Sequence, residues 1–229
     1  MRTRPVDDGA RGAMIQAVHA YVTDKVIPVA GEFERTHEFP HEIIADLTEM
    51  GLLRMNIPEQ WGGLDLDLAT RSGVFRENQL DVGRINIANL GVGVGQAAYD
   101  AAARYAADRT AFGQAIDSLE GIQFKLAEMA TKLYAARVVA GDVAARYDAG
   151  EDVSVEAAMA KYFCSEVGIE VSLDAVRIHG GAGYVSDFPV ERFFRDAPLN
   201  AIGEGTNEIL KMLIARGLKK RAGGTGATR

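Results

Sequence analysis

The sequence predicts an all-α protein, with an N-terminal helical segment, a C-terminal up-and-down four-helix bundle and essentially no β-sheet. Apolar residues recur at helical spacing through almost every segment between the turns, and no segment alternates apolar and polar residues as a half-buried strand would. The clearest pattern lies in residues 122–147, where apolar positions step by four and three along the chain. Such a seam is typical of a long helix packed in a bundle.

The first part of the chain predicts short helices joined by turns. Residues 11–34 carry apolar side chains at helical spacing, and a second helix follows Pro40 and stops near Gly51. Residues 57–64 predict a loop because they are rich in proline and glycine. Residues 67–76 predict one more short helix.

Longer helices are expected in the second part of the chain. Residues 81–109 contain no proline and many small side chains, which predicts one long helix. The next two helices are expected over residues 122–147 and 154–179, because glycines follow both segments. A further helix follows Thr206, a good N-cap residue, and runs to about Leu218. The loops between these helices are short, as antiparallel neighbours in a bundle require.

One short motif matches a nucleotide-binding fingerprint, but the segments around it do not fit such a site. Residues 93–98 match the GxGxxA fingerprint of dinucleotide-binding folds. That fingerprint needs a strand before it, and here it lies inside a helical pattern, so we reject it. We interpret the small residues as contacts that allow close helix packing.

Composition excludes several classes of function. The 229 residues carry a formal net charge of −7, and the one basic run is short, so nucleic acid is not an expected partner. Cys164 is the sole cysteine and the four histidines lack ligand spacing, so we expect neither a disulfide nor a metal site. The sequence contains no run of about 18 apolar residues, the length that a membrane-spanning helix needs. The start of the chain lacks the apolar core of a secretory signal, so we expect a cytoplasmic protein.

A carboxylate on a tight turn is the first candidate for chemistry. Glu204 lies between Gly203 and Gly205, just before the helix that follows Thr206. Glycines let the backbone bend and approach a ligand, and an ionised carboxylate beside a ligand can act as a general base. The alternative is an acidic residue that only complements the helix dipole, an effect of about 0.3–1 kcal/mol. The spacing alone favours this alternative.

Several segments of the chain carry a family resemblance. Residues 56–64 read Asn-Ile-Pro-Glu-Gln-Trp-Gly-Gly-Leu, residues 80–84 read Leu-Asp-Val-Gly-Arg, and residues 109–113 read Arg-Thr-Ala-Phe-Gly. Residues 177–184 read Arg-Ile-His-Gly-Gly-Ala-Gly-Tyr, and residues 202–209 contain Glu204. In this order they resemble segments of the flavin-dependent acyl-CoA dehydrogenases. The resemblance divides the chain into an N-terminal helical region of that type at 1–76, a C-terminal bundle domain at 79–218 and a disordered tail at 219–229.

The resemblance implies roles for individual residues. Glu204 corresponds to the base that removes the α-proton of an acyl thioester while the β-hydride passes to flavin N5. Some members carry the base at the position of Gly83, and glycine cannot serve as one. Asp81, Arg84 and Gly205 are expected to line the substrate site. The expected FAD contacts are Arg109, Phe112, Arg177, Gly180, Gly181, Thr206, Asn207 and Glu208.

The resemblance also implies partners and shows departures from the family. The implied partners are an acyl-CoA thioester, an electron-transfer partner for the reduced flavin and further copies of the chain in a homodimer or homotetramer. Arg109 is expected to reach the FAD diphosphate of a neighbouring subunit. Arg177 stands where members usually have glutamine, and Gly203 stands where many have tyrosine.

A β-rich middle domain of the family has no counterpart in the sequence. Residues 71–79 join the two matching blocks directly, and no strand-rich segment replaces that domain. Three alternatives follow: an FAD-dependent acyl-CoA dehydrogenase, a non-catalytic helical relative that acts as an oligomeric binding module, or a protein whose printed sequence omits an internal segment. Flavin absorbance distinguishes the first two, and an intact mass above 24.6 kDa would establish the third.

Overall fold

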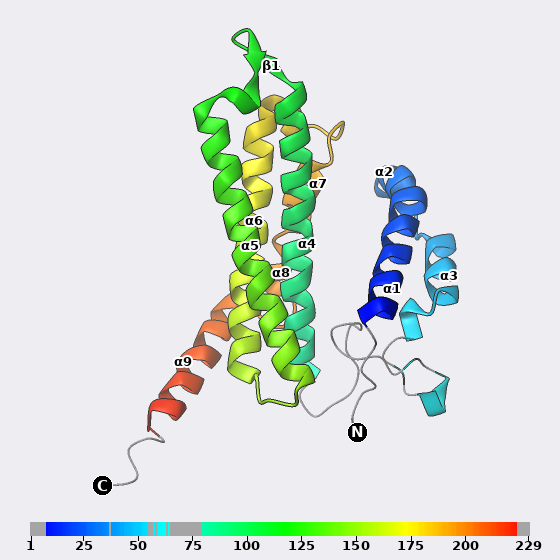
Figure 1. Cartoon of the computed structure of the whole chain (residues 1–229), viewed down its shortest axis with the longest axis vertical. Helices are drawn as coiled ribbons and strands as arrows, with labels where there is room; N and C mark the ends of the chain where they lie inside the picture. Colours follow the sequence, from blue (N-terminus) through cyan, green and yellow to red (C-terminus); the bar gives the residue numbers. More distant parts are fainter. Residues whose placement is uncertain are drawn as a thin grey trace. The chain divides into compact units, whose positions relative to one another are not determined.

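In the computed structural model, the chain is described over residues 8–36, 38–54, 57, 59–62, 64 and 79–223. The fold separates into two compact units, Met1–Val74 and Phe75–Arg229. Figure 1 shows that helices make up nearly all of the ribbon in both units, which confirms the all-α prediction. Each unit is treated below by itself.

The N-terminal unit is built from short helices. Helix α1 (Asp8–Tyr21) continues through a π-helical turn, η1 (Val22–Val26), into α2 (Ile27–Thr36), and α3 spans His41–Glu49. The Tyr21 hydroxyl donates to an Asp46 carboxylate oxygen at 3.0 Å and so joins α1 to α3. Gly51 has a φ of +79°, a left-handed conformation that follows the end of α3. The helices predicted before and after Pro40 are confirmed. The helix predicted over 67–76 lies outside the described residues.

Two further turns complete the described part of this unit. They are the 3₁₀ turns η2 (Leu52–Arg54) and η3 (Glu59–Trp61). The Leu64 backbone N–H donates to the Arg54 carbonyl at 3.0 Å, which brings the end of the segment back to its start. The segment predicted as a loop therefore has local turns but no long helix.

Long helices form the core of the C-terminal unit. Helices α4 (Gln79–Asp108), α5 (Glu120–Asp148) and α6 (Ser154–His179) lie side by side (Figure 1). The predicted seam of α5 is its buried face, made by Met129, Leu133, Ala136, Ala140 and Val143. Gly150 and Gly180 follow α5 and α6 with φ values of +85° and +60°, which confirms the glycine-terminated helices.

Helices α4 and α6 approach so closely that their backbones touch. A Cβ atom added to Gly168 would lie 2.6 Å from the Gly91 carbonyl oxygen, and one added to Gly91 would lie 2.7 Å from the Cys164 carbonyl oxygen. Gly95, within the rejected GxGxxA match, lies under Leu133, whose Cδ2 atom would be 2.9 Å from an added Cβ. The small residues of α4 therefore serve helix packing, as predicted. Gly93 is the exception, since open space surrounds it.

The C-terminal part of the chain returns along α6. The 3₁₀ turn η5 (Gly180–Tyr184), α7 (Val190–Asp196) and α8 (Leu199–Ile202) lead into α9 (Asn207–Gly223). Helix α9 packs mainly on α6 and extends away from the other long helices (Figure 1). Helix α9, the fourth helix of the predicted bundle, therefore packs mainly against one of the three long helices.

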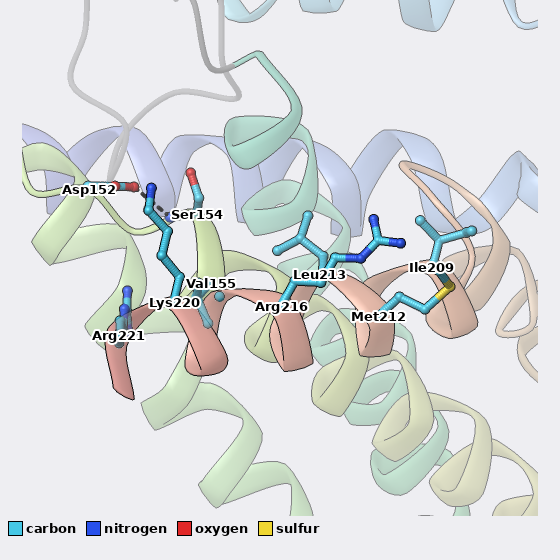
Figure 2. Close-up of a pocket in the computed structure, with 10 residues that line it drawn as sticks. Asp152, Ser154, Val155, Ile209, Met212, Leu213, Arg216, Lys220 and Arg221 are labelled. Carbon is cyan, nitrogen blue, oxygen red and sulfur yellow. Dashed lines mark hydrogen bonds between the residues drawn. The ribbon is translucent and has the colours of Figure 1, made fainter. Parts of the chain in front are cut away.

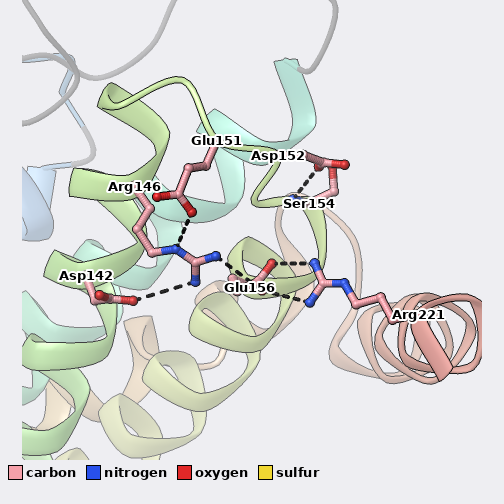
Figure 3. A network of polar contacts seen from close by, with 7 residues as sticks. All are labelled: Asp142, Arg146, Glu151, Asp152, Ser154, Glu156 and Arg221. Atoms are coloured by element: carbon pink, nitrogen blue, oxygen red, sulfur yellow. Dashed lines mark hydrogen bonds and ion pairs between the residues drawn. The ribbon is translucent and has the colours of Figure 1, made fainter. Parts of the chain in front are cut away.

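The predicted disordered tail begins too early. Helix α9 continues to Gly223, so residues 219–223 are helical, and residues 224–229 lie outside the described part of the chain. Figure 3 shows the reason: the Arg221 guanidinium pairs with both carboxylate oxygens of Glu156 on α6, at 2.8 and 3.0 Å. Arg146 on α5 extends this network with bonds to Glu151 at 2.8 Å and to Glu156 at 3.6 Å.

A short hairpin between α4 and α5 was not predicted. Strands β1 (Thr110–Ala111) and β2 (Gln114–Ala115) pair antiparallel, and the 3₁₀ turn η4 (Ile116–Ser118) leads into α5. Phe112 and Gly113 form the two-residue loop with φ values of +53° and +81°. Two successive left-handed residues are typical of a type I′ turn, which joins strands at their natural twist. The strands are too short to give an alternating pattern in the sequence.

Candidate active site

The turn before α9 carries Glu204 in a left-handed conformation. Glu204 has a φ of +54° and Gly205 a φ of +95°. Gly203 has a φ of −62° and a ψ of 150°, an extended conformation open to any residue. Only one of the two flanking glycines therefore uses its conformational freedom, and Glu204 itself holds a conformation that costs about 1–2 kcal/mol in a residue with a side chain.

The Glu204 carboxylate lies directly over Gly83 of α4. A Cβ atom added to Gly83 would lie 2.5 Å from the carboxyl carbon of Glu204 and 3.0 Å from its Cγ. The side chain therefore fills the space that a residue with a side chain at position 83 would occupy. Glu204 is exposed and has no hydrogen-bond partner among the described residues, so its carboxylate is open to a ligand.

Asp81 and Arg84 form a buried ion pair beside Gly83. The Arg84 Nη1 atom donates to the Asp81 Oδ1 atom at 3.0 Å, and the two residues are 7% and 4% exposed. The Ser154 hydroxyl of α6 donates to the other Asp81 oxygen at 2.6 Å. The Arg84 Nε atom is buried with no partner among the described residues. Both residues lie in the first turns of α4 on either side of Gly83, and their predicted place in a substrate site stays a prediction.

At the start of α9, one predicted site residue is buried and the next is exposed. Asn207 is 2% exposed, and its amide nitrogen donates to the Ser165 hydroxyl at 3.0 Å and to a Glu166 carboxylate oxygen at 2.7 Å. The Asn207 side chain therefore already bonds to residues of α6. Glu208 is exposed, and its own backbone N–H and the Thr206 hydroxyl lower the pKa of its carboxyl group.

Sequence reasoning missed Lys161 on α6. This lysine is 0% exposed, and its ammonium donates to the Gly205 carbonyl at 2.8 Å and to Asn207 Oδ1 at 2.9 Å. The signal was available, because Lys161 lies among small and apolar residues in a segment that reads as buried on most sides. A charged residue in such a segment is rarely buried without a partner.

A second group of predicted residues lies at the other end of the bundle. Phe112 at the hairpin tip is 93% exposed, and Arg109 is exposed where α4 ends. Arg177 on the last turn of α6 is exposed and pairs with Asp174 at 3.1 Å. Gly180 and Gly181 follow it, and a Cβ added to either would meet nothing within 4 Å. This end of the bundle therefore offers two cations, an exposed aromatic ring and open backbone.

An open groove of about 580 Å³ lies beside this second group. Arg104, Asp108 and Arg109 border it, and His179 stacks on Tyr105 with ring centroids 4.1 Å apart. The His179 Nδ1 atom donates to the Ala175 carbonyl at 2.8 Å, which is the local hydrogen bond expected at a helix end. Burial lowers the pKa of His179, so the ring is neutral near pH 7.

The structure thus separates the predicted site residues into two clusters. Glu204, Gly205, Asp81 and Arg84 lie near the start of α4, whereas Arg109 and its neighbours lie past its end. The helix between Gly83 and Asp108 rises roughly 38 Å, at about 1.5 Å per residue. The start-of-helix cluster is therefore far from the end-of-helix cluster within one chain.

A second groove, of about 800 Å³, runs along α9. Figure 2 shows that Ile209, Met212, Leu213 and Arg216 reach it from one side of α9, at the spacing of a single helix face. Val155 of α6 completes its apolar floor. The basic residues Lys220 and Arg221 border its end, near Asp152 and Ser154.

The described residues offer neither a membrane-spanning helix nor a metal-binding cluster. Across the described ranges, no helix is long and apolar enough to cross a membrane. The same residues hold no group of three or more histidine, cysteine, aspartate or glutamate side chains that could bind a metal ion.

Comparison with known families identifies the fold and the motifs. The family described as "Acyl-CoA dehydrogenase, C-terminal domain" matches residues 73–219, and "Acyl-CoA dehydrogenase, N-terminal domain" matches residues 10–105. Because the first match alone spans more than half of the chain, this protein belongs to the acyl-CoA dehydrogenase family. The two matches overlap, so the chain lacks the middle region that would lie between the two domains.

Individual relatives agree with this assignment over about three fifths of the chain. The chain is 47% identical over 141 residues to a 3-(aryl)acrylate reductase of Clostridium sporogenes, a match that covers 62% of this chain and 37% of the relative. It is 42% identical over 142 residues to subunit CarC of the caffeyl-CoA reductase-Etf complex of Acetobacterium woodii, covering 62% and 38%. The structure of butyryl-CoA dehydrogenase from Megasphaera elsdenii matches with a TM-score of 0.61 and 38% identity, covering 61% and 37%. The matched segment spans well under half the length of each relative.

Proposed function

We propose that this chain catalyses, or contributes the base for, the FAD-dependent α,β-dehydrogenation of an acyl-CoA thioester. The observation that carries the proposal is the exposed carboxylate of Glu204 seated over Gly83. Two positions that can hold the base in this family meet at one point in space, and here one of them has no side chain. Glu204 is then the single carboxylate available at that point among the described residues.

The chain's own residues account for the proton step. Glu204 takes the α-proton of the thioester as general base, because its carboxylate is open and lies near the start of α4. The buried pair of Asp81 and Arg84 fixes the adjoining wall of the site. FAD, when bound, supplies the acceptor for the β-hydride.

The residues present fit the adenosine diphosphate part of FAD. Phe112 is 93% exposed at the tip of the hairpin, where its ring can stack on a flat ligand. Arg109 would pair with phosphate oxygens, and the open backbone at Gly180–Gly181 allows close approach. Arg177 would add a second cation. At the other end of the bundle, the backbone N–H groups at the start of α9 suit phosphate oxygens.

The separation of the two clusters supports oligomer formation. Roughly 38 Å of α4 lies between them, which is longer than one dinucleotide can span. Arg109 and Phe112 would therefore hold a cofactor whose reacting end lies beside Glu204 of another copy. We propose a homodimer or homotetramer, and light scattering that found a strict monomer at micromolar concentration would contradict it.

A flavin-reduction assay tests the proposed activity. The purified chain is mixed with excess FAD, separated from free flavin and then treated with butyryl-CoA while the flavin absorbance is followed. The wild type should bleach the bound flavin, and Glu204→Gln should lower the bleaching rate by about 10²-fold or more while FAD affinity stays within about twofold. Glu191→Gln on α7 is the matched control, because it removes a carboxylate that pairs with Arg195, four residues away on the same helix.

The missing middle region supports a second candidate function. Leu199, Ile202, Ile209 and Met212 expose between 49% and 67% of their surface on α8 and α9. Ile209 and Met212 also line the groove of Figure 2. A helical relative without catalytic activity would use this apolar surface in an oligomeric assembly. Protein that stays colourless in excess FAD but forms a stable oligomer would favour this function over the first.

The proposed electron-transfer partner rests on a relative. The similar CarC chain is named as a subunit of a complex with Etf. By analogy we propose that a flavoprotein accepts electrons from the reduced FAD. Reoxidation of the bleached protein by such a flavoprotein, faster than by oxygen, would support this role.

A further inference from the structure

Lys161 is the most deeply buried charged side chain of the described bundle. It is 0% exposed, at the third helical turn of α6, among residues that are themselves buried. Lysine is almost never fully buried unless its ammonium is paired. Removal from water lowers its pKa, and the carboxylates of Glu166, Glu208 and Glu204 act against that effect. A lysine kept at such a cost has a specific structural task.

The contacts of Lys161 go to the turn that carries Glu204. Its ammonium donates to the Gly205 carbonyl at 2.8 Å, directly after Glu204, and to Asn207 Oδ1 at 2.9 Å. Ser165 and Glu166, one helical turn further along α6, accept from the Asn207 amide. Helix α6 therefore holds this turn from both sides of Thr206.

The turn needs such a hold because its backbone is strained. Glu204 and Gly205 both have positive φ, and a residue with a side chain in that region costs about 1–3 kcal/mol. A strained conformation persists only where its surroundings determine it. Glu204 has no hydrogen bond of its own among the described residues. The Gly203 N–H bond to the Leu199 carbonyl, at 2.9 Å, restrains the backbone before it, and the Lys161 bonds to the Gly205 carbonyl and Asn207 restrain the backbone after it.

We propose that Lys161 is the positioning residue for the Glu204 base, holding the Gly205 carbonyl so that the carboxylate stays over Gly83. The proposal deepens the dehydrogenase function proposed above and rests on it. Lys161 touches neither substrate nor cofactor. It acts through the Gly205 carbonyl and the Asn207 side chain, and its loss should release the turn without unfolding the three-helix core.

The first test measures the turn itself in the full chain. Lys161→Met keeps a long unbranched side chain and removes the ammonium. Hydrogen exchange followed by mass spectrometry should show at least tenfold faster exchange in peptides covering residues 203–210, with peptides of α5 unchanged. Lys211→Met is the matched control, because Lys211 is exposed on α9 with its ammonium 4.7 Å from the Tyr162 ring centroid. The control should exchange as the wild type does.

The second test separates positioning from general stability. In flavin reduction by butyryl-CoA, Lys161→Met should lower the limiting rate by about 10²-fold, as expected for about 1 Å of misplacement, with half-saturation and FAD affinity nearly unchanged. In the Glu204→Gln background the same change should add almost nothing, because both variants remove one function. A loss that is fully additive would overturn the proposal.

The outcomes distinguish this inference from the proposed activity. If the wild type reduces no flavin, the proposed function fails, and the exchange test alone decides whether Lys161 holds the turn. Unchanged exchange at residues 203–210 overturns the inference whatever the activity. If Lys161→Met does not fold, Lys161→Gln replaces it. Glutamine keeps a polar donor, but its side chain is one bond shorter than that of lysine and does not reach the Gly205 carbonyl. The same results are expected.

Discussion

Replacing Gly83 by alanine should stabilise the protein and impair its chemistry at the same time. Gly83 lies within α4, where alanine is favoured over glycine by about 0.5–1 kcal/mol. The atom that the new Cβ meets is the carboxyl end of an exposed glutamate, which can rotate away at little cost. The free energy of unfolding should therefore rise by about 0.5–1 kcal/mol.

The functional effect follows from the distance. The new Cβ would lie 2.5 Å from the Glu204 carboxyl carbon, whereas two carbon atoms in contact lie about 3.5 Å apart or more. The carboxylate must therefore move by about 1 Å. A displacement of that size at a reacting group can lower a rate by about 10²-fold, so flavin reduction in Gly83→Ala should fall by about that factor.

Urea denaturation and flavin reduction, measured on the same preparations, check both parts. Gly141→Ala is the matched control, because Gly141 lies in α5 with nothing within 4 Å of the added Cβ, so it gains helix stability without touching Glu204. Wild-type reduction rates in Gly83→Ala would refute the placement of the base. Destabilisation by more than about 1 kcal/mol would show that the Cβ meets rigid atoms, which also contradicts the reasoning.

Two further predictions concern the bundle. Gly168→Ala should destabilise the protein by about 1–3 kcal/mol in the same denaturation assay, because its Cβ would meet the Gly91 carbonyl at 2.6 Å and the two helices must separate; a stabilised variant would contradict the close crossing. The bond from Arg221 lowers the pKa of Glu156 to about 2, from an ordinary value of 4.5, so the ion pair of Figure 3 stabilises the fold above about pH 4.5 and is lost as the pH falls through about 2. Arg221→Met should lower the free energy of unfolding at pH 6, only slightly because Arg221 is half exposed, and by less near pH 2; an equal cost at both pH values would contradict the role of the pair.

Local patterns in the sequence were sufficient for most of the fold. The heptad seam of α5 became its buried face because the spacing of apolar side chains fixes which side of a helix meets its neighbours. Gly150 and Gly180 ended their helices because a left-handed residue is needed there. The hairpin at Phe112 was missed, since two-residue strands are too short to show a period.

The candidate site depended more on contacts between distant segments. The motif around Glu204 indicated a base. The sequence did not show that its carboxylate lies over Gly83, because the two residues are far apart in the chain. Asn207 was predicted to contact FAD, yet its side chain is bonded to α6 in this structure. Whether its backbone still contacts the cofactor stays a prediction. The apolar surroundings of Lys161 in the sequence indicated a buried lysine, but its partners, the Gly205 carbonyl and Asn207, lie more than 40 residues away in the chain and only the fold identifies them.

By itself the sequence determined the helical class, the length of most helices and the motifs of the acyl-CoA dehydrogenase family, because these depend on spacing within a few turns. Tertiary structure decided the rest. It placed Glu204 over Gly83, buried Lys161 against the Gly205 carbonyl and put Arg109 roughly 38 Å along α4 from the base. These relations arise only when helices pack, since packing fixes which groups distant in the chain come within a few ångströms of each other.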